Sequence, residues 1–370
     1  MKKTHFLLKK YFNSLLVFAG LGSFFFCTET FAGSYFDHRA TEEEIQRAFQ
    51  SNFEYHKRLA NIPDQRGRAT VRPVEDTATF GYVLMSAQEP NSEVTNLRRI
   101  IAQNLPAKTK LVILANTDDV DLIKKEYQPW ISADRLIIAT DNSTENGLWA
   151  RDSFPVPVYT TNSKKVSLVN AKYYRDFSSG DAVAASVGAH NQKEEFTLVG
   201  GNLIADENGN CFSIDSYRLF GTTSADIIAA YGCKTHHIMP HVSGIGDVDE
   251  VLKPLPGKRI LTNAAAYKKD LESWGYEVIM LPSISNSYRT YANSLIVGAT
   301  VFMPSFGVKT DDQAKSVYEK LGYQVIKIQT NSLSDDMHGS IHCQTMAYPP
   351  MNQKLLLEAL KNHSDPLTIQ

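Results

Sequence analysis

Short apolar segments alternate with amphipathic helical patterns along most of this 370-residue chain. Leu111–Leu114 and Arg135–Ala139 are short and rich in aliphatic residues, as buried strands are, and Thr117–Tyr127 between them has a helical pattern. Strands that alternate with helices are typical of α/β folds. The pattern therefore predicts an α/β protein.

A joint in which a helix stops at a glycine and a strand begins at once occurs three times in the second half of the chain. The glycines are Gly232, Gly275 and Gly322, which lie 43 and 47 residues apart. Glycine suits this place because the residue after a helix often needs a positive φ. A period of this length is typical of repeat architectures such as propellers. An ordinary doubly wound sheet contains the same joints, so the spacing alone leaves both folds open.

The residues before this pattern are predicted to form an extension. Ala40–Ala60 has a helical pattern, with Thr41 as its N-cap and Glu44 in place to complete a capping box. Asn61–Thr77 is rich in Pro, Gly, Arg and Asp and is predicted to be a linker. The expected division is a signal peptide over 1–32, extension and linker over 33–75, the main domain over 76–351 and a tail over 352–370.

The first 32 residues resemble a secretory signal peptide. Four lysines precede the apolar run Leu15–Cys27, and Thr30-Phe31-Ala32 has the small residues of a cleavage site. A membrane anchor is the alternative, but thirteen residues are too few to span a bilayer. We therefore expect an exported protein, periplasmic or secreted, without a membrane partner after cleavage.

Removing the signal would change the formal net charge from −2 to −5, because four lysines and one glutamate are lost. A mildly acidic protein lacks the basic surface that nucleic-acid binding needs. Export would also remove Cys27 and leave Cys211, Cys233 and Cys343 in an oxidising compartment. If Cys211 and Cys233 form a disulfide, Cys343 is a free thiol and a candidate for chemistry. An inert buried thiol is the alternative.

Acidic residues in two loops suggest what such a thiol would act on. Trp149-Ala150-Arg151-Asp152 follows a predicted strand, as Asp249 does, and if successive units are arranged around an axis their loops open on one face. Carboxylates hold a flat guanidinium cation through paired hydrogen bonds, and a thiolate can attack its central carbon. Each residue alone is typical of a surface or packing position, but together with Cys343 they suggest a guanidinium site.

Five short motifs then occur in order over about residues 75–350: Trp149-Ala150-Arg151-Asp152-Ser153-Phe154-Pro155, Gly200-Gly201-Asn202 with Asp206, Val248-Asp249-Glu250, Tyr291-Ala292-Asn293 and Ile341-His342-Cys343-Gln344-Thr345. The ordered set resembles the bacterial, Porphyromonas-type peptidylarginine deiminase and agmatine deiminase family. The resemblance implies a fivefold pseudosymmetric α/β propeller. It also implies a cysteine that converts the guanidinium of a guanidino substrate to a ureido group with loss of ammonia, without a cofactor or metal.

The resemblance assigns a role to each motif. Cys343 would be the nucleophile, and Asp152 and Asp249 would grip the guanidinium nitrogens. Arg175 is a candidate for binding a substrate carboxylate, with an ordinary surface arginine as the alternative. The residues that would shape or support the pocket are Trp149, Arg151, Asn202 and Asn293.

The third motif departs from the family pattern. The family has glycine-histidine-x-aspartate, whereas this chain has Gly246-Asp247-Val248-Asp249, so an aspartate stands where a histidine would shuttle protons. An aspartate is a poor proton donor at neutral pH unless burial, or a like-charged neighbour such as Asp249, raises its pKa. Three outcomes stay open: His241 is the shuttle, Asp247 or His342 serves instead, or the protein binds guanidino compounds without turnover.

A second departure bears on the substrate. Val199 replaces the glutamate that agmatine deiminases commonly place before their double glycine, which favours arginine, free or peptidyl, over agmatine. Export favours the same choice, since agmatine turnover is normally cytosolic. Agmatine deimination and amidinotransfer are kept as alternatives. The sequence does not specify the oligomeric state.

Overall fold

The computed structural model describes residues 36–60, 71–142, 144–161, 165–285 and 288–351. Within these residues, no helix combines the length and the apolar character that crossing a membrane would require. The predicted signal peptide and C-terminal tail lie outside the described residues, as do residues 61–70 of the predicted linker.

The described strands form five small sheets, in the orders β1-β5-β6-β7, β10-β9-β8, β11-β12-β13, β14-β15-β16 and β17-β2-β3-β4. The strands are β1 (Val71–Pro73), β2 (Tyr82–Ser86), β3 (Lys110–Asn116), β4 (Leu136–Asp141), β5 (Val156–Thr160), β6 (Val166–Lys172), β7 (His190–Thr197), β8 (Ile204–Ala205), β9 (Asn210–Ile214), β10 (Thr235–Met239), β11 (Leu252–Leu255), β12 (Arg259–Thr262), β13 (Glu277–Met280), β14 (Leu295–Val297), β15 (Thr300–Ser305), β16 (Gln324–Gln329) and β17 (Met346–Tyr348).

All five sheets contain the same three-strand unit. A first strand runs antiparallel to a second, which runs parallel to a third, and one helix connects the second strand to the third. These connecting helices are α3 (Ser92–Asn104), α6 (Gly180–Val187), α7 (Ser224–Tyr231), α8 (Lys268–Ser273) and α9 (Thr310–Lys320). The predicted alternation of strands and helices is therefore confirmed. Two neighbouring parallel strands cannot be joined by a tight turn and need a crossover connection. This is why a helix lies between the second and third strands of each unit in the sequence.

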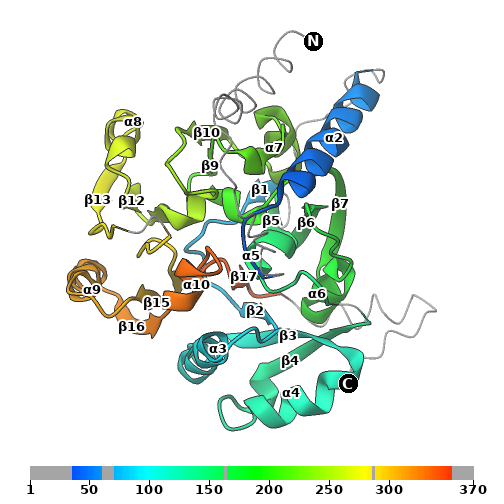
Figure 1. The fold of residues 1–370 in the computed structure, drawn as a ribbon, viewed down its shortest axis with the longest axis vertical. Coiled ribbons are helices and arrows are strands. Elements are labelled where there is room, and N and C mark those ends of the chain that lie inside the picture. The colour runs from blue at the N-terminus through cyan, green and yellow to red at the C-terminus, as the bar shows by residue number, and fades with distance from the viewer. Residues whose placement is uncertain (1–35, 61–70, 143, 162–164, 286–287, 352–370) are drawn as a thin grey trace, which may run out of the picture.

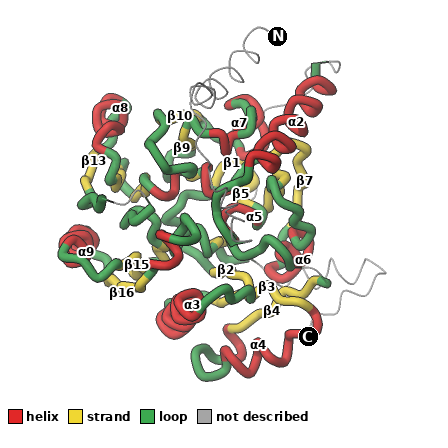
Figure 2. The backbone as a smooth tube through the Cα atoms, viewed as in Figure 1, coloured by secondary structure: helices red, strands yellow, loops and turns green. Residues whose placement is uncertain are grey.

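The sheets surround a middle region in which the short helices α5 (Ala150–Ser153) and α10 (Asn331–Asp335) lie with β17 (Figure 1). The connecting helices lie towards the outside of the same view (Figure 2). A buried apolar cluster extends from α3, β2, β3 and β15 to Trp149, Ile341 and Cys343. The predicted nucleophile is therefore in the interior of the fold.

The glycine joints have the conformation that their sequence position predicts. Gly232, Gly275 and Gly322 have φ values of 71°, 87° and 93°, and each precedes the third strand of its unit. At Gly232 a side chain would also have no room, because its Cβ would overlap the backbone of Val71. Positive φ at the end of each helix turns the chain into the following strand.

The N-terminal extension contains the predicted helix, α2 (Glu42–Leu59), with the Thr41–Glu44 capping box. Asn52 fixes α2 to the rest of the protein, because its side-chain amide donates to the backbone oxygens of Thr197 and Phe220. The predicted linker over Asn61–Thr77 needs one correction. Its residues Val71–Pro73 form β1, which pairs with β5, so this part of the segment is an edge strand of a sheet.

Candidate active site

Cys343 lies in the loop between α10 and β17 and is completely buried. Its Sγ accepts a hydrogen bond from Asn293 Nδ2 at 3.0 Å and lies 3.8 Å from Asp249 Oδ2. The backbone oxygen of Cys343 accepts from Arg151 N at 3.1 Å. Burial raises the pKa of the Cys343 thiol well above its usual value, and the charges of Asp249 and other nearby carboxylates raise it further. In this arrangement the sulfur is a neutral thiol.

Asp249 belongs to a short 3₁₀ turn, Val248–Glu250, and its carboxylate meets His342 as well as the thiol. His342 Nδ1 lies 2.6 Å from Asp249 Oδ2, and Nε2 lies 3.0 Å from Asp76 Oδ1. Asp76 also accepts from Lys253 Nζ at 2.7 Å, and both of these side chains are buried. A continuous line of charged and polar groups therefore leads from Lys253 to Cys343.

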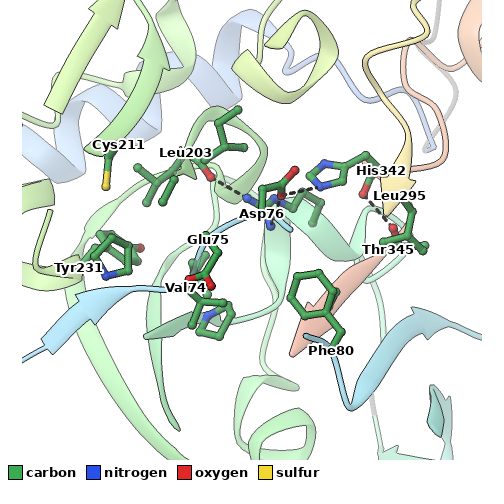
Figure 3. A pocket seen from close by; sticks show the side chains of 17 residues that line it. Val74, Glu75, Asp76, Phe80, Leu203, Cys211, Tyr231, Leu295, His342 and Thr345 are labelled. Carbon is green, nitrogen blue, oxygen red and sulfur yellow. Dashed lines mark hydrogen bonds and ion pairs between the residues drawn. The ribbon is translucent and has the colours of Figure 1, made fainter. Parts of the chain in front are cut away.

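A pocket lies beside this line (Figure 3). Most of its lining is apolar, including Phe80 and Leu295, and its charged and polar lining residues include Glu75, Asp76, Arg151, His342 and Thr345. The residues that line the pocket do not include Cys343. The pocket is therefore lined by His342 and by Asp76, its partner on the side away from the sulfur, and not by the Cys343 thiol.

Asp152 comes from α5, and its Oδ2 receives two hydrogen bonds from inside the protein. Arg218 Nη2 donates to it at 2.7 Å, and His38 Nε2 lies 2.6 Å from it. Arg218 also donates through Nε to Asp247 Oδ1 at 2.7 Å, and His38 Nε2 lies 3.5 Å from Asp247 Oδ2. Burial opposes ionisation of Asp152, but His38 and Arg218 lower its pKa below the usual value. The predicted guanidinium-binding carboxylate is thus already paired with an arginine of the chain itself.

The aspartate at the position of the family histidine has an unusual acidity. Burial raises the pKa of Asp247 to about 7, with a further increase from the negative charges of Asp152 and Asp249 that Arg218 opposes. The neighbouring Glu250 is also buried, and burial raises its pKa well above the usual value. Both carboxyl groups can therefore carry a proton near neutral pH.

The Gly200-Gly201-Asn202 motif brings α5 close to the third motif. A Cβ on Gly200 would overlap the backbone oxygen of Arg151, and one on Gly201 would lie 2.6 Å from Asp152 Oδ1. Asn202 accepts from the backbone N–H of Val248 at 3.2 Å and is fully buried. Two glycines are needed because backbone and a carboxylate both occupy the space of a side chain.

The structure brings together most of the residues that the sequence analysis selected. Cys343, Asp249 and Asn293 are in contact, and Asp247 contacts the groups that surround Asp152. Those that support the site are Trp149, Arg151, Asn202 and His342. Two candidates lie elsewhere. His241 is exposed in the loop after β10, outside this buried cluster, and Arg175 is bound to Glu44 and to the backbone of Arg39.

Four residues of the site were missed: His38, Asp76, Arg218 and Glu250. Glu250 stands within a recognised motif, so its position could have been noticed. His38 and Asp76 fall in the segments that were predicted to be an extension and its boundary, and Arg218 follows no motif. The atoms of His38, Glu250 and Cys343 that could bind a metal lie within 4.8 Å of one another, and so do those of His38, Asp152 and Asp247. Both sets share His38, which is already hydrogen-bonded to Asp152.

Cys211 and Cys233 form the predicted disulfide, with Cα atoms 5.8 Å apart. Cys211 is in β9, and Cys233 immediately follows the glycine joint at Gly232. Cys343 is the free cysteine among the described residues. The conditional prediction of an unpaired thiol at Cys343 is thereby confirmed.

Comparisons with known proteins point in one direction. Residues 258–349 match the model of the family described as Porphyromonas-type peptidyl-arginine deiminase. No curated protein sequence matches the chain. Among solved structures, the agmatine deiminase of C. jejuni is 14% identical, with a TM-score of 0.60, and the match covers 76% of this chain and 96% of that chain.

Two further structures agree. A Porphyromonas gingivalis protein assigned as an arginine deiminase is 19% identical, with a TM-score of 0.60 over 75% of this chain and 98% of that chain. The agmatine deiminase of Enterococcus faecalis is 13% identical, with a TM-score of 0.61 over 76% of this chain and 97% of that chain. At these identities the structural matches establish the fold alone. The resemblance seen in the sequence is confirmed: residues 258–349 carry the Porphyromonas-type peptidyl-arginine deiminase signature, and the chain has the α/β fold of the agmatine and arginine deiminases.

Proposed function

We propose that this protein is an exported, cysteine-dependent hydrolase that deiminates arginine, free or within a peptide, to citrulline and ammonia. The observation that carries the proposal is the position of Cys343 Sγ, 3.0 Å from Asn293 Nδ2 and 3.8 Å from Asp249 Oδ2. The nearby charges of Asp249, Glu250 and Asp152 all act on the same sulfur. A nucleophile surrounded by carboxylates suits a carbon centre that carries a positive charge.

In the proposed reaction, Asp152 and Asp249 hold the terminal nitrogens of a guanidinium. The substrate cation would offset the negative charges that raise the pKa of Cys343, so substrate binding would favour loss of the thiol proton to solvent and formation of the thiolate, which regains a proton when the product is released. Sγ then attacks the guanidinium carbon. One C–N bond breaks, and that nitrogen leaves as ammonia after taking up a proton. Water adds to the thiouronium carbon, the C–S bond breaks, and the ureido product and the thiol are released.

Proton transfer in both steps is assigned to Asp247. With a pKa of about 7 its carboxyl can give a proton to the departing nitrogen and then accept one from water. Each ring nitrogen of His342 already faces a carboxylate, at 2.6 Å and 3.0 Å, which suits a residue that positions Asp249. His241 is exposed, so the assignment of the shuttle to His241 has no support from its position.

Two further parts of the proposal concern architecture and location. The five units of common topology support a fivefold pseudosymmetric propeller. The N-terminal lysines and apolar run support export, and the Cys211–Cys233 disulfide suits an oxidising compartment such as the periplasm or the exterior.

A second candidate function is guanidino binding without turnover. It is favoured by the internal pairing of Asp152 with Arg218 and His38, and by the neutral, buried thiol. In this case arginine compounds would bind, and ammonia would not be released.

The test measures citrulline and ammonia from arginyl peptides, free arginine and agmatine, with the purified protein and its Cys343→Ser variant. We expect citrulline from an arginine substrate and none from the variant. Added amine acceptors would reveal amidinotransfer by the mass of the product. If no guanidino compound gives product and a haloacetamidine does not label Cys343, even when His38 is replaced by glycine, the proposed function is wrong.

A further inference from the structure

Residues 36–39 of the extension run beside the candidate site and are held there by their backbone. His38 N donates to the backbone oxygen of Met337 at 2.9 Å. The backbone oxygen of His38 accepts from Arg218 Nη1 at 2.7 Å and from Tyr174 Oη at 2.9 Å. Trp149 Nε1 donates to the backbone oxygen of Phe36 at 3.0 Å. The backbone of this short segment is therefore fixed at Phe36 and at His38.

The side chain of His38 extends from this peptide into the site. Its Nε2 lies 2.6 Å from Asp152 Oδ2, and its ring lies 4.6 Å from the Trp149 ring. A ring nitrogen of His38 is also within 4.8 Å of Cys343 Sγ. A flat group that offers N–H to Asp152, contacts Trp149 and lies near the sulfur occupies the place that the proposed reaction gives to a substrate guanidinium.

The neighbouring part of the extension has a matching contact. Arg175, the residue expected to bind a substrate carboxylate, donates through Nε to Glu44 Oε1 at 3.0 Å. Its Nη2 donates to the backbone oxygen of Arg39, also at 3.0 Å. Thus the Glu44 carboxylate and the Arg39 backbone carbonyl, both from the extension, occupy the hydrogen-bonding groups of Arg175 that would otherwise bind a substrate carboxylate.

The extension also closes the site. The exposed fractions of Cys343, Asp152 and His38 are 0%, 4% and 3%. A substrate guanidinium would compete with the His38 ring, which lies 2.6 Å from Asp152 Oδ2 and has a nitrogen within 4.8 Å of the sulfur. Because His38 is attached to the segment that precedes α2, moving the segment would remove the ring from Asp152 and the sulfur without unfolding the sheets, while Arg218 stays paired with Asp152.

We propose that residues 36–39 are a built-in peptide ligand, with the His38 side chain in the guanidinium position, and that substrate binds only when this segment withdraws. The proposal rests on the proposed function for the nature of the substrate. It also describes the mouth of the site as a surface that binds a polypeptide whose side chain enters towards Cys343. A peptide with an internal arginine would use the contacts that now hold His38.

The first experiment measures how fast iodoacetamide alkylates Cys343 in the full-length protein, followed by peptide mapping. His38→Gly removes the inserted ring, and we expect the alkylation rate to rise about tenfold or more. The loss of one strong hydrogen bond shifts the equilibrium between the closed and the open segment by about this factor. The matched control is His190→Gly, which removes an exposed histidine of β7 and should leave the rate unchanged. A rate in His38→Gly equal to that of the wild type would overturn the proposal.

A second variant tests the same position without emptying it. His38→Arg places a guanidinium on the bound segment, and we expect residue 38 to acquire the mass of citrulline. The Cys343→Ser background should prevent this conversion, in which water supplies the oxygen and ammonia leaves. If His38→Gly is poorly folded, as thermal unfolding would show, His38→Arg remains an independent test. An arginine at position 38 that stays intact in a protein that deiminates added peptides would contradict the proposal.

The outcomes separate this inference from the proposed function. Faster alkylation of His38→Gly without product from any guanidino compound would support the blocking segment and reject the deiminase. A wild-type protein that is active, and that loses its turnover in His38→Gly, would identify His38 as a proton shuttle and overturn the blocking role. Faster alkylation together with higher citrulline production would support both.

Discussion

The buried ion pair between Lys253 and Asp76 offers a test of how the site is held in place. The two side chains are 0% and 3% exposed, and Nζ lies 2.7 Å from Oδ2. Lys253→Met keeps the aliphatic stem and removes the charge. Breaking a buried pair leaves an uncompensated charge and costs about 3–5 kcal/mol. Asp76 keeps His342 at 3.0 Å and Arg151 at 3.9 Å, so we expect the lower value, about 3 kcal/mol.

The loss should depend on pH in a defined direction. Burial raises the pKa of Asp76, but Lys253, His342 and Arg151 outweigh it and hold the pKa well below the usual value. The ionised carboxylate therefore stabilises the folded state above the pKa of the unfolded chain, about 4, and this contribution is lost as pH falls. Without Lys253 the folded pKa rises, the contribution is smaller, and the difference between variant and wild type narrows towards acidic pH.

Urea unfolding followed by tryptophan fluorescence measures this free energy at pH 7 and at pH 4. Lys234→Met, at an exposed lysine, is the control and should change the free energy of unfolding by less than about 0.5 kcal/mol. Adding Asp76→Asn to Lys253→Met removes the orphaned charge and should restore part of the stability. A loss below about 1 kcal/mol at pH 7, or a double variant no more stable than the single one, would refute the reasoning.

Three further predictions concern other parts of the structure. Cys211→Ser should lower the free energy of unfolding by about 3 kcal/mol, as expected for a disulfide between residues 22 apart, and should leave the catalytic reaction intact. Urea unfolding without reductant measures this loss, and an unchanged midpoint would contradict the prediction. Gly201→Ala should reduce kcat/KM roughly 100-fold, because its Cβ displaces a carboxylate that lies 2.6 Å away, and wild-type kinetics would exclude that displacement. Asp247→Asn should abolish the change of kcat/KM near pH 7 in the pH–rate profile, since the carboxyl of Asp247 can donate a proton below this pH and has lost it above. If the change near pH 7 persists in the variant, it belongs to another group.

Local features of the fold were predictable because their causes lie within a few residues. The Thr41–Glu44 capping box and the positive φ of Gly232 and Gly275 follow from side chains and backbone geometry inside one turn. Apolar runs such as Leu111–Leu114 identified strands in the same way. The prediction of a linker was wrong over Val71–Pro73, because a Pro-rich segment also suits an edge strand. Here the segment pairs with β5 and forms such a strand.

The chemistry of the site could be expected only in part. The motif order pointed to Cys343, Asp152 and Asp249, and in the structure Asp249 lies 3.8 Å from the buried sulfur of Cys343, whose pKa the charge of Asp152 also raises. The sequence predicted a raised pKa for Asp247 only if the side chain is buried or has a like-charged neighbour. In the structure both burial and the neighbouring carboxylates raise its pKa. Whether a carboxyl is buried depends on elements that surround it from distant parts of the chain, so the sequence could state the condition and not its fulfilment.

By itself, then, the sequence determined the repeated strand and helix units and the residue types of the site, and it made Cys343 a free thiol on the condition that Cys211 and Cys233 pair. Only the tertiary structure decided that His38 meets Asp152, 114 positions away, and that His342 meets Asp76, 266 positions away. Periodicity and capping report interactions between neighbours along the chain. Side chains on separate loops meet only where the packing of whole elements brings their backbones together, and no short-range pattern encodes that meeting.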